Sequence, residues 1–280
     1  MATRSAIINV MARAADKAAR GLRRDFGEVE QLQVSMKGPG DFVSTADLKA
    51  ERTLREELNK ARPGFAFLME ESGATPGSDP SHRWLVDPLD GTTNFLHGIP
   101  HFAISIGLER EGELIAGVVY DPIKEELFWA ERGMGAYLND RRLRVSSRRK
   151  LDQALLATGM PARHGVEAGA RGVFVAQVDA ALAATAGVRR LGSAALDLAY
   201  VAAGRYEGFW ENHLSAWDIA AGIVLVREAG GYVSDLDGRD DLLTTGNTLA
   251  ANDHLHKSIG RLLRSAAKLA AAARKSSTAP

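Results

Sequence analysis

Apolar side chains recur with helical periodicity in the first sixty residues of the chain. One stripe predicts an amphipathic helix over about residues 5–30. A second stripe follows Ser44 or Thr45, either of which can cap a helix, and it ends at Pro63-Gly64. The chain therefore begins with two predicted helices, each with one apolar face to bury.

Short apolar or alternating runs dominate the next eighty residues, and this pattern is typical of strands. The predicted strands are Phe65–Met69, Trp84–Val86, Phe102–Leu108, Leu114–Tyr120 and Glu126–Ala130. Glu111-Gly112 and Asn139-Asp140 lie where hairpin turns would join neighbouring strands. Short connections of this kind indicate a largely antiparallel sheet.

After about residue 150, predicted strands alternate with longer helical stripes. The strands are Leu155–Thr158, Tyr206–Trp210 and Tyr232–Ser234, and the helices are Phe174–Ala186, Ser193–Ala203, Ala216–Ala229 and 257–274. Such alternation favours α/β packing. We therefore expect an α+β half over residues 1–145 and an α/β half over residues 146–280.

The composition narrows the chemistry that the chain can perform. Its 280 residues include 35 basic and 35 acidic side chains and no cysteine. The lack of cysteine excludes disulfides, zinc–thiolate sites, iron–sulfur clusters and a cysteine nucleophile. A net charge of zero provides no global attraction to nucleic acid or membranes, and no apolar run reaches the ~18–20 residues that span a bilayer. The first thirty residues lack the apolar core of a secretion signal, so we expect a cytoplasmic protein.

The most informative stretch is the turn that follows the predicted strand Trp84–Val86. The strand delivers Asp87, Pro88 turns the chain, and Asp90 returns beside Asp87. Two adjacent carboxylates repel each other unless a cation lies between them. Free N–H groups at the start of a following helix suit a phosphate. This layout fits metal-assisted phosphoryl hydrolysis, although Asp, Pro and Gly also occur together in plain surface turns.

Two other segments place acids at similar positions. Glu70-Glu71-Ser72 follows the predicted strand Phe65–Met69, and Asp218 lies in the first turn of the predicted helix Ala216–Ala229. Taken singly, such acids are usually a solvated strand end or a favourable partner of the helix dipole. Their shared pattern makes them candidates for one site.

Taken together, these segments resemble the inositol monophosphatase family of Mg2+-dependent, lithium-sensitive phosphatases. The matching stretches, in family order and spacing, are residues 41–47, 70–72, 84–95, 217–222 and 228–231. The resemblance implies the layered αβαβα sandwich of the sugar phosphatases, with the active site where the two halves meet. It also implies that the first half supplies most metal ligands and the second supplies Asp218 and the wall facing the substrate.

The resemblance further implies two or three Mg2+ ions. Glu70, Asp87 and the backbone carbonyl of Leu89 would hold the first ion. Asp87, Asp90 and Asp218 would hold the second, and Glu70 would also touch a weaker third ion. An all-oxygen donor set with few carboxylates is what Mg2+ prefers.

By the same resemblance, a metal-activated water attacks the phosphate directly, without a covalent intermediate. Glu70 takes part in catalysis, and Thr92 would accept or relay the proton of this water, oriented by Asp47. The amides of Gly91 and Thr92 would bind phosphate oxygens, beside Asp90.

The substrate implied by the resemblance is myo-inositol 1-phosphate, a phosphorylated polyol. Its alcohol side would lie against Gly192-Ser193-Ala194-Ala195 and Glu211, whose carboxylate can accept O–H bonds. Lys37 occupies a loop where the family has a lysine near the active site, but its spacing to Asp41 differs by about one residue, so its role stays open. The resemblance also implies a homodimer.

Two alternatives remain open at this point. The same metal centre serves sibling activities on fructose 1,6-bisphosphate, histidinol phosphate or adenosine 3′,5′-bisphosphate. A function of another class is RNA or protein binding by the basic segment 141–150, which has six cations in ten residues. Such a run is more often a solvated linker, and this one has no interleaved aromatic residues for base stacking.

Overall fold

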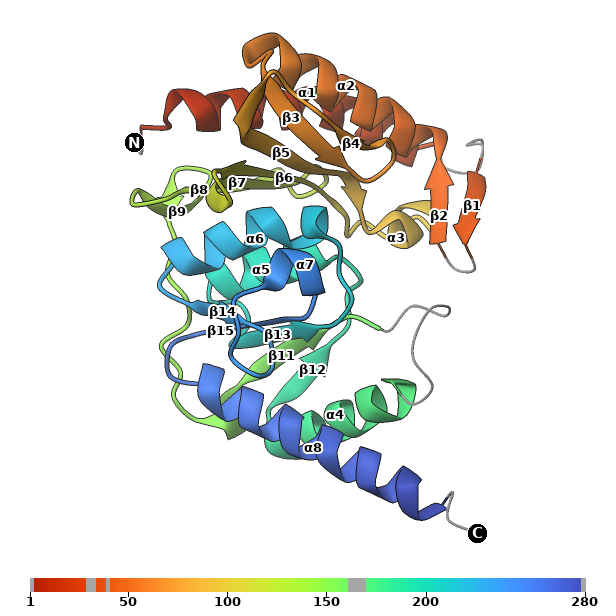
Figure 1. Cartoon of the computed structure of the whole chain (residues 1–280), viewed down its shortest axis with the longest axis vertical. Helices are drawn as coiled ribbons and strands as arrows, with labels where there is room; N and C mark the ends of the chain where they lie inside the picture. The colour runs from red at the N-terminus through yellow and green to blue at the C-terminus, as the bar shows by residue number, and fades with distance from the viewer. Residues whose placement is uncertain (1–2, 29–33, 39–40, 161–169, 278–280) are drawn as a thin grey trace.

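The computed structural model describes residues 3–28, 34–38, 41–160 and 170–277. Its elements stack in five layers, helix pair, sheet, helices, sheet, helix pair, as Figure 1 shows from top to bottom. The predicted αβαβα sandwich is therefore confirmed. Among the described residues, no helix is both long and apolar enough to cross a lipid bilayer.

The first layer consists of α1 (Ala6–Phe26) and α2 (Thr45–Ala61). Both helices begin close to the predicted positions. Side-chain caps fix these starts, because Ser5 accepts a hydrogen bond from the Ile8 amide and Ser44 forms a capping box with Asp47. The hairpin of β1 (Val34–Gly38) and β2 (Asp41–Ser44) leads into α2. The apolar faces of α1 and α2 cover one face of the larger sheet (Figure 1).

The larger sheet has eight strands in the order β10-β9-β8-β7-β6-β5-β3-β4. Its strands are β3 (Phe65–Met69), β4 (Gly73–Thr75), β5 (Asp79–Asp90), β6 (Ala103–Arg110), β7 (Glu113–Asp121), β8 (Glu126–Glu131), β9 (Gly135–Leu138) and β10 (Arg141–Arg142). All neighbours pair antiparallel except β3 and β5, which run parallel. The prediction of a largely antiparallel sheet is confirmed, and its parallel pair ends beside the acidic turn.

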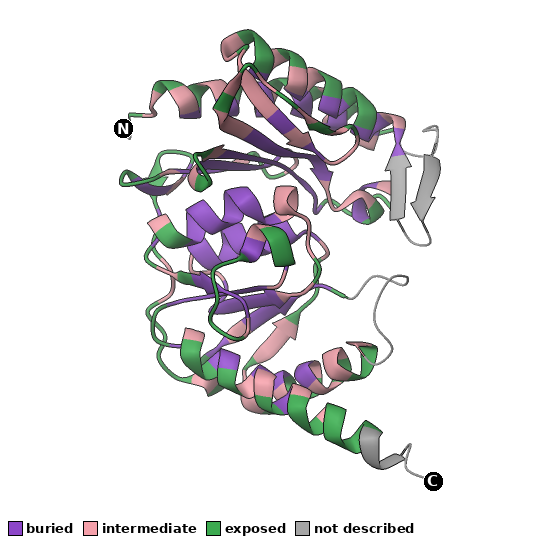
Figure 2. Ribbon diagram, in the orientation of Figure 1, coloured by how far each residue is buried: buried purple, intermediate pink, exposed green. Residues whose placement is uncertain are grey.

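The central layer contains α5 (Ala194–Ala202), α6 (Ala216–Glu228) and the short α7 (Leu242–Thr245). Figure 2 shows that α5 and α6 are buried along nearly their whole length. Two glycines let α6 approach the larger sheet, since Gly107 and Gly117 are register partners in β6 and β7. A Cβ at Gly117 would lie 2.5 Å from the Ala221 carbonyl oxygen.

The second sheet has the order β12-β11-β13-β15-β14. Its strands are β11 (Leu155–Thr158), β12 (Gly187–Arg189), β13 (Gly208–Glu211), β14 (Tyr232–Ser234) and β15 (Thr248–Ala251), and its outer face carries α4 (Ala170–Ala184) and α8 (His256–Ser277). The short strands β12 and β15 have no counterpart among the predicted elements. The division at residue 145 stays a prediction, since α6 packs against strands of both sheets.

The glycine pair provides a test of how closely α6 is packed. Gly117→Ala should lower the free energy of unfolding by about 1–3 kcal/mol, because the new methyl group meets helix backbone that cannot rotate away. Urea denaturation measures the change. Gly21→Ala is the matched control, since a Cβ there meets nothing within 4 Å, and it should leave stability equal or slightly higher. Equal stability of the Gly117 variant and the wild type would contradict the packing argument.

Candidate active site

The acidic site begins where the parallel pairing between β3 and β5 ends. Met69 of β3 is the register partner of Val86 of β5, so the residues that follow them, Glu70 and Asp87, emerge at the same edge. The Glu70 amide continues the pairing by donating to the Val86 carbonyl at 3.1 Å. The strand ends that the sequence predicts separately are therefore neighbours in the sheet.

The segment from Asp87 to Gly91, which comprises the irregular end of β5 and the turn after it, is held by its own side chains. β5 continues through Pro88 to Asp90, so the predicted turn at Pro88 is wrong and the chain turns at Gly91. The Leu89 amide donates to Asp87 Oδ1 at 2.9 Å. Gly91 has a φ of 96°, a left-handed conformation that favours glycine, and it precedes the short helix α3 (Thr92–Leu96). The Thr92 hydroxyl lies 3.1 Å from Asp47 Oδ1 and 3.0 Å from the Leu89 carbonyl oxygen, both possible acceptors.

Asp47 lies behind this turn and not on the cavity surface. It is fully buried, and its Oδ2 accepts hydrogen bonds from the Ser44 amide and hydroxyl at 2.8 and 2.6 Å. Burial raises the pKa of Asp47, and the bonds from Ser44 oppose this shift. The first turn of α2 thus presents one oxygen of a buried carboxylate to the Thr92 hydroxyl.

Two central helices bring the other side of the site to the sheet edge. At the start of α5, the Ser193 hydroxyl and the Ala195 amide donate to Asp90 Oδ2 at 2.5 and 2.8 Å. At the start of α6, Asp218 Oδ2 accepts from the Ser215 amide at 2.7 Å. The Ser105 hydroxyl of β6 donates to the Trp217 carbonyl at 3.1 Å, which fastens this end of α6 to the sheet.

These elements enclose one cavity of about 180 Å³. The predicted site residues that line it are Glu70, Asp87, Leu89, Asp90, Gly91, Thr92, Gly192, Ser193, Ala194, Glu211 and Asp218. Four further residues that the sequence did not predict also line the cavity: Gly159, Arg190, Asp197 and Leu214. The side chain of Lys37 is outside the described residues.

The carboxyl groups of the cavity lie close to one another, with Asp87 buried and Glu70, Asp90 and Asp218 partly buried. Burial raises the pKa of Asp87 well above its ordinary value, and the charges of Glu70, Asp90 and Asp218 add to the shift. Burial and Asp90 likewise raise the pKa of Asp218. The pKa of Asp90 rises only to about 6, since burial is opposed by the hydrogen bonds from Ser193 and Ala195.

A hard divalent cation suits this cavity. Four carboxylates and the Leu89 carbonyl provide only oxygen donors, and the raised pKa values of Asp87 and Asp218 indicate that their negative charge is not balanced by nearby cations. Among the described residues, no group of three or more His, Cys, Asp or Glu side chains is already placed to hold a metal ion. Mg2+ needs few protein ligands, because it keeps water and substrate oxygens in its coordination shell.

The Glu211 carboxyl group lies against Gly159, in space that the side chain of any other residue at position 159 would fill. A Cβ on Gly159 would lie 1.7 Å from Glu211 Oε1. Thr158 and Trp210 are register partners in parallel β11 and β13, so Gly159 and Glu211 follow them at one edge. Burial, followed by the charge of Asp90, raises the pKa of Glu211 to about 8.

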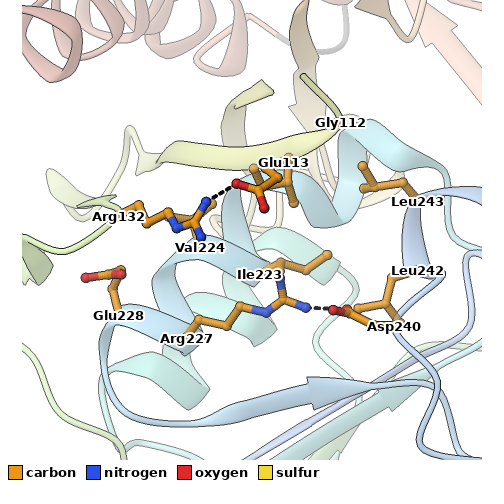
Figure 3. Close-up of a pocket in the computed structure, with 11 residues that line it drawn as sticks. Gly112, Glu113, Arg132, Ile223, Val224, Arg227, Glu228, Asp240, Leu242 and Leu243 are labelled. Atoms are coloured by element: carbon orange, nitrogen blue, oxygen red, sulfur yellow. Dashed lines mark hydrogen bonds and ion pairs between the residues drawn. The ribbon is translucent and has the colours of Figure 1, made fainter. Parts of the chain in front are cut away.

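A larger hollow, of about 500 Å³, lies at the opposite end of α6 (Figure 3). Glu113 pairs there with Arg132, and Arg227 pairs with Asp240. The Glu228 carboxylate accepts bonds from the Gly133 and Gly135 amides at 2.9 and 2.8 Å. Because these charges satisfy one another, this hollow is a weaker candidate for chemistry than the smaller acidic cavity.

Known proteins resemble this chain along nearly its whole length. Residues 3–274 match the model of the Inositol monophosphatase family. An inositol-1-monophosphatase of Mesorhizobium japonicum is 60% identical over 256 residues, covering 91% of this chain and 95% of that protein. The Nus factor SuhB of Escherichia coli is 44% identical over 253 residues, covering 90% and 94%. The crystal structure of the extragenic suppressor protein suhB from Bartonella henselae has a TM-score of 0.89 at 56% identity, covering 92% and 98%.

The raised pKa values predict how stability changes with pH in metal-free protein. Asp87, Asp218 and Glu211 bind protons more tightly when folded than when unfolded. The free energy of unfolding should therefore fall as the pH rises from about 5 to 8, by ~1.4 kcal/mol for each unit of pKa difference. Urea denaturation in EDTA measures this slope.

Two variants and the addition of Mg2+ test whether the cavity acids cause this pH dependence. Glu211→Gln should flatten the slope, whereas Glu56→Gln, on an exposed position of α2, should not. Excess Mg2+ should restore stability most at pH 8, because it binds the ionised carboxylates. A stability that rises between pH 5 and 8 in EDTA would show that these acids are not buried together.

Proposed function

The chain belongs to the inositol monophosphatase family and is a phosphatase, and from this premise we propose that its substrate is myo-inositol 1-phosphate. Relatives at 54–60% identity are named inositol-1-monophosphatase. The observation that supports the proposal most is the meeting of four carboxylates from three separate segments around one cavity. The reaction is hydrolysis of a phosphate monoester, in which water replaces the polyol oxygen on phosphorus.

The metal ligands are part of this proposal. Glu70, Asp87 and the Leu89 carbonyl would hold one Mg2+, and Asp87, Asp90 and Asp218 a second, with Glu70 touching a third. Bound Mg2+ lowers the pKa of water and neutralises phosphate charge. The raised pKa values of Asp87 and Asp218 support these assignments, because such groups gain most from a cation.

Thr92, Asp47 and Glu70 would handle the attacking water. The Thr92 hydroxyl can accept a proton from water while it donates its own to Asp47 Oδ1, 3.1 Å away. Ser44 holds the other Asp47 oxygen, so the carboxylate is already oriented before substrate arrives. Glu70, at the end of β3, also lines the cavity and would help to orient the water.

Backbone and side-chain donors would position the phosphate. Gly91 and Thr92 line the cavity at the start of α3, where amides are not used by an earlier helical turn. A Cβ at Gly91 would come within 3.1 Å of the His101 carbonyl oxygen, so the turn is tightly packed as well as left-handed. Asp90, held by Ser193, would lie between the phosphate and the alcohol.

The alcohol would lie against Gly192, Ser193, Ala194 and Glu211, which line the side of the cavity formed by α5 and β13. This wall distinguishes inositol phosphate from the sibling substrates, whose cleavage needs the same metal centre. Buried carboxyl oxygen is a suitable acceptor for ring hydroxyls and a poor neighbour for further phosphate groups. A homodimer, a cytoplasmic location and lithium sensitivity stay predictions.

The basic segment 141–150 is less favourable as an RNA-binding surface than its composition indicates. Arg148 donates to the buried Glu207 carboxylate at 2.8 Å, and the Asn252 side chain donates to the Ser146 and Arg148 carbonyls. These contacts fasten the connection between the two sheets. RNA affinity that persists at physiological salt, without phosphatase turnover, would favour the alternative.

Asp90→Asn should lower kcat at least ~100-fold, because an amide binds cations more weakly while it keeps an acceptor for Ser193. Phosphate release from inositol 1-phosphate in Mg2+ measures the loss, and circular dichroism checks the fold. Asp16→Asn, on the exposed side of α1, should keep wild-type turnover. Near-normal activity of the Asp90 variant would remove this residue from the proposed machinery.

A substrate panel tests the identity of the alcohol. With Mg2+, kcat/KM should be highest for inositol 1-phosphate among that ester, fructose 1,6-bisphosphate, histidinol phosphate and adenosine 3′,5′-bisphosphate, because Glu211 can accept polyol hydroxyls. EDTA should abolish turnover of all four. Faster hydrolysis of adenosine 3′,5′-bisphosphate would assign the enzyme to a sibling activity.

A further inference from the structure

Asp197 is a buried carboxyl group that the reaction described above does not use. It lies in α5, one helical turn after Ser193, and its side chain lines the same cavity as Asp90 and Glu211. The residue is only 1% exposed. Its Oδ1 atom has no hydrogen-bond partner among the described residues.

A buried carboxyl oxygen that lacks a hydrogen-bond partner lowers the stability of the folded state. A buried polar group without a hydrogen bond costs about 1–3 kcal/mol, and an ionised one costs more. Burial raises the pKa of Asp197 well above its ordinary value, with Glu211 and Asp90 adding to the shift. Arg190 is the one cation among the residues that line the described cavity, and its charge opposes the rise. The fold therefore places at the cavity wall an acceptor atom that none of the described residues uses.

The position of Asp197 decides what could satisfy it. It comes from α5, on the same side as Ser193 and Glu211, whereas Glu70 and Asp87 come from the sheet edge opposite. Glu211 lies against Gly159, near enough to Asp197 for its charge to act on that residue. It therefore adds a second acceptor group on this side of the cavity. Two neighbouring carboxyl groups match the hydroxyl donors of a ligand with more than one hydroxyl group.

We propose that Asp197 is a specificity-determining residue, which accepts a hydrogen bond from a hydroxyl group of the polyol and acts together with Glu211. This inference rests on the proposed function, because it concerns the alcohol side of the same substrate. The bond forms only when a polyol enters, so Asp197 contributes to selection between alcohols and not to the cleavage of the phosphate ester. A phosphate ester without hydroxyl groups gains nothing from it.

The test compares two substrates in the wild type and in Asp197→Ala. For inositol 1-phosphate, the variant should raise KM and lower kcat/KM about tenfold or more. For phenyl phosphate, which has no hydroxyl groups, kcat/KM should stay within about twofold. Alanine suits a helix and removes an unsatisfied group, so the Tm of the substrate-free variant should equal or exceed that of the wild type.

Asp197→Asn and Asp25→Ala complete the design. Asparagine keeps one acceptor oxygen, so it should lose less selectivity than alanine, and it replaces alanine if that variant fails to fold. Asp25 is a buried aspartate with partners, Arg24 and Lys49. Asp25→Ala should lower Tm and leave the ratio of the two kcat/KM values unchanged.

Deoxy analogues of inositol 1-phosphate identify the hydroxyl group concerned. The wild type should lose about tenfold in kcat/KM with one analogue, and Asp197→Ala should show little further loss with that same analogue. Equal losses in both enzymes for every analogue would overturn the proposal. An equal fall for inositol 1-phosphate and phenyl phosphate, together with a lower Tm, would also overturn it and assign Asp197 a structural role.

The outcome for the wild type separates this proposal from the one on which it rests. If the wild type has equal kcat/KM values for phenyl phosphate and inositol 1-phosphate, the proposal of a polyol substrate is contradicted. A wild type that prefers inositol 1-phosphate, with the same preference in Asp197→Ala, contradicts only the role of Asp197.

Discussion

Mutual repulsion among buried carboxyl groups is the constraint on which this site depends. Glu70, Asp87, Asp90 and Asp218 share one small cavity, and their proximity helps to raise the pKa values of Asp87, Asp90 and Asp218. A chain that gathers such groups loses stability unless something else binds to them. The surrounding hydrogen bonds offset only part of this loss, as those from Ser193 to Asp90 show. A cationic ligand and a dianionic substrate complete the balance of charge, which is why the cluster is suited to phosphate chemistry.

The layered fold supplies the rigidity that holds these charges together. α6 is buried along its length and lies against bare backbone at Gly107 and Gly117. Its N-terminal end, with Asp218, is therefore carried to the edge of the larger sheet. The bond between Ser105 and the Trp217 carbonyl fixes the same junction from the sheet side. The acids of the site are thus attached to the two cores and not to independent loops.

The cavity has two sides with different origins, and this division suggests how chemistry and selectivity are separated. The sheet edge and the turn after β5 present the groups that we assign to cations and phosphate. α5 and β13 contribute Asp197 and Glu211, respectively, which line the side of the cavity that we assign to the alcohol. Changes on the second side can alter the preferred alcohol without disturbing the first.

Local patterns in the chain were enough to predict much of this arrangement. The strand that carries Asp87 and the capping of α2 by Ser44 are encoded by neighbours in sequence, because each depends on a few adjacent backbone angles and hydrogen bonds. The turn predicted at Pro88 was wrong, because pairing with β6 continues the strand to Asp90. The largely antiparallel sheet and its helical cover followed from periodicity. Short strands such as β12 and β15 were missed, since three or four residues carry little periodic signal.

Only the tertiary structure decided which of these acids are buried and what lies beside them. Asp197 reads in the sequence as an ordinary residue of a helix, and Gly159 as the end of a strand. The parallel pairing of β11 and β13 places Gly159 beneath Glu211. The docking of α5 buries Asp197 at the cavity wall and leaves its Oδ1 atom without a hydrogen-bond partner among the described residues. Strand order and helix docking bring together residues that are far apart in the chain. Burial then changes their proton affinity, a property that no single segment contains.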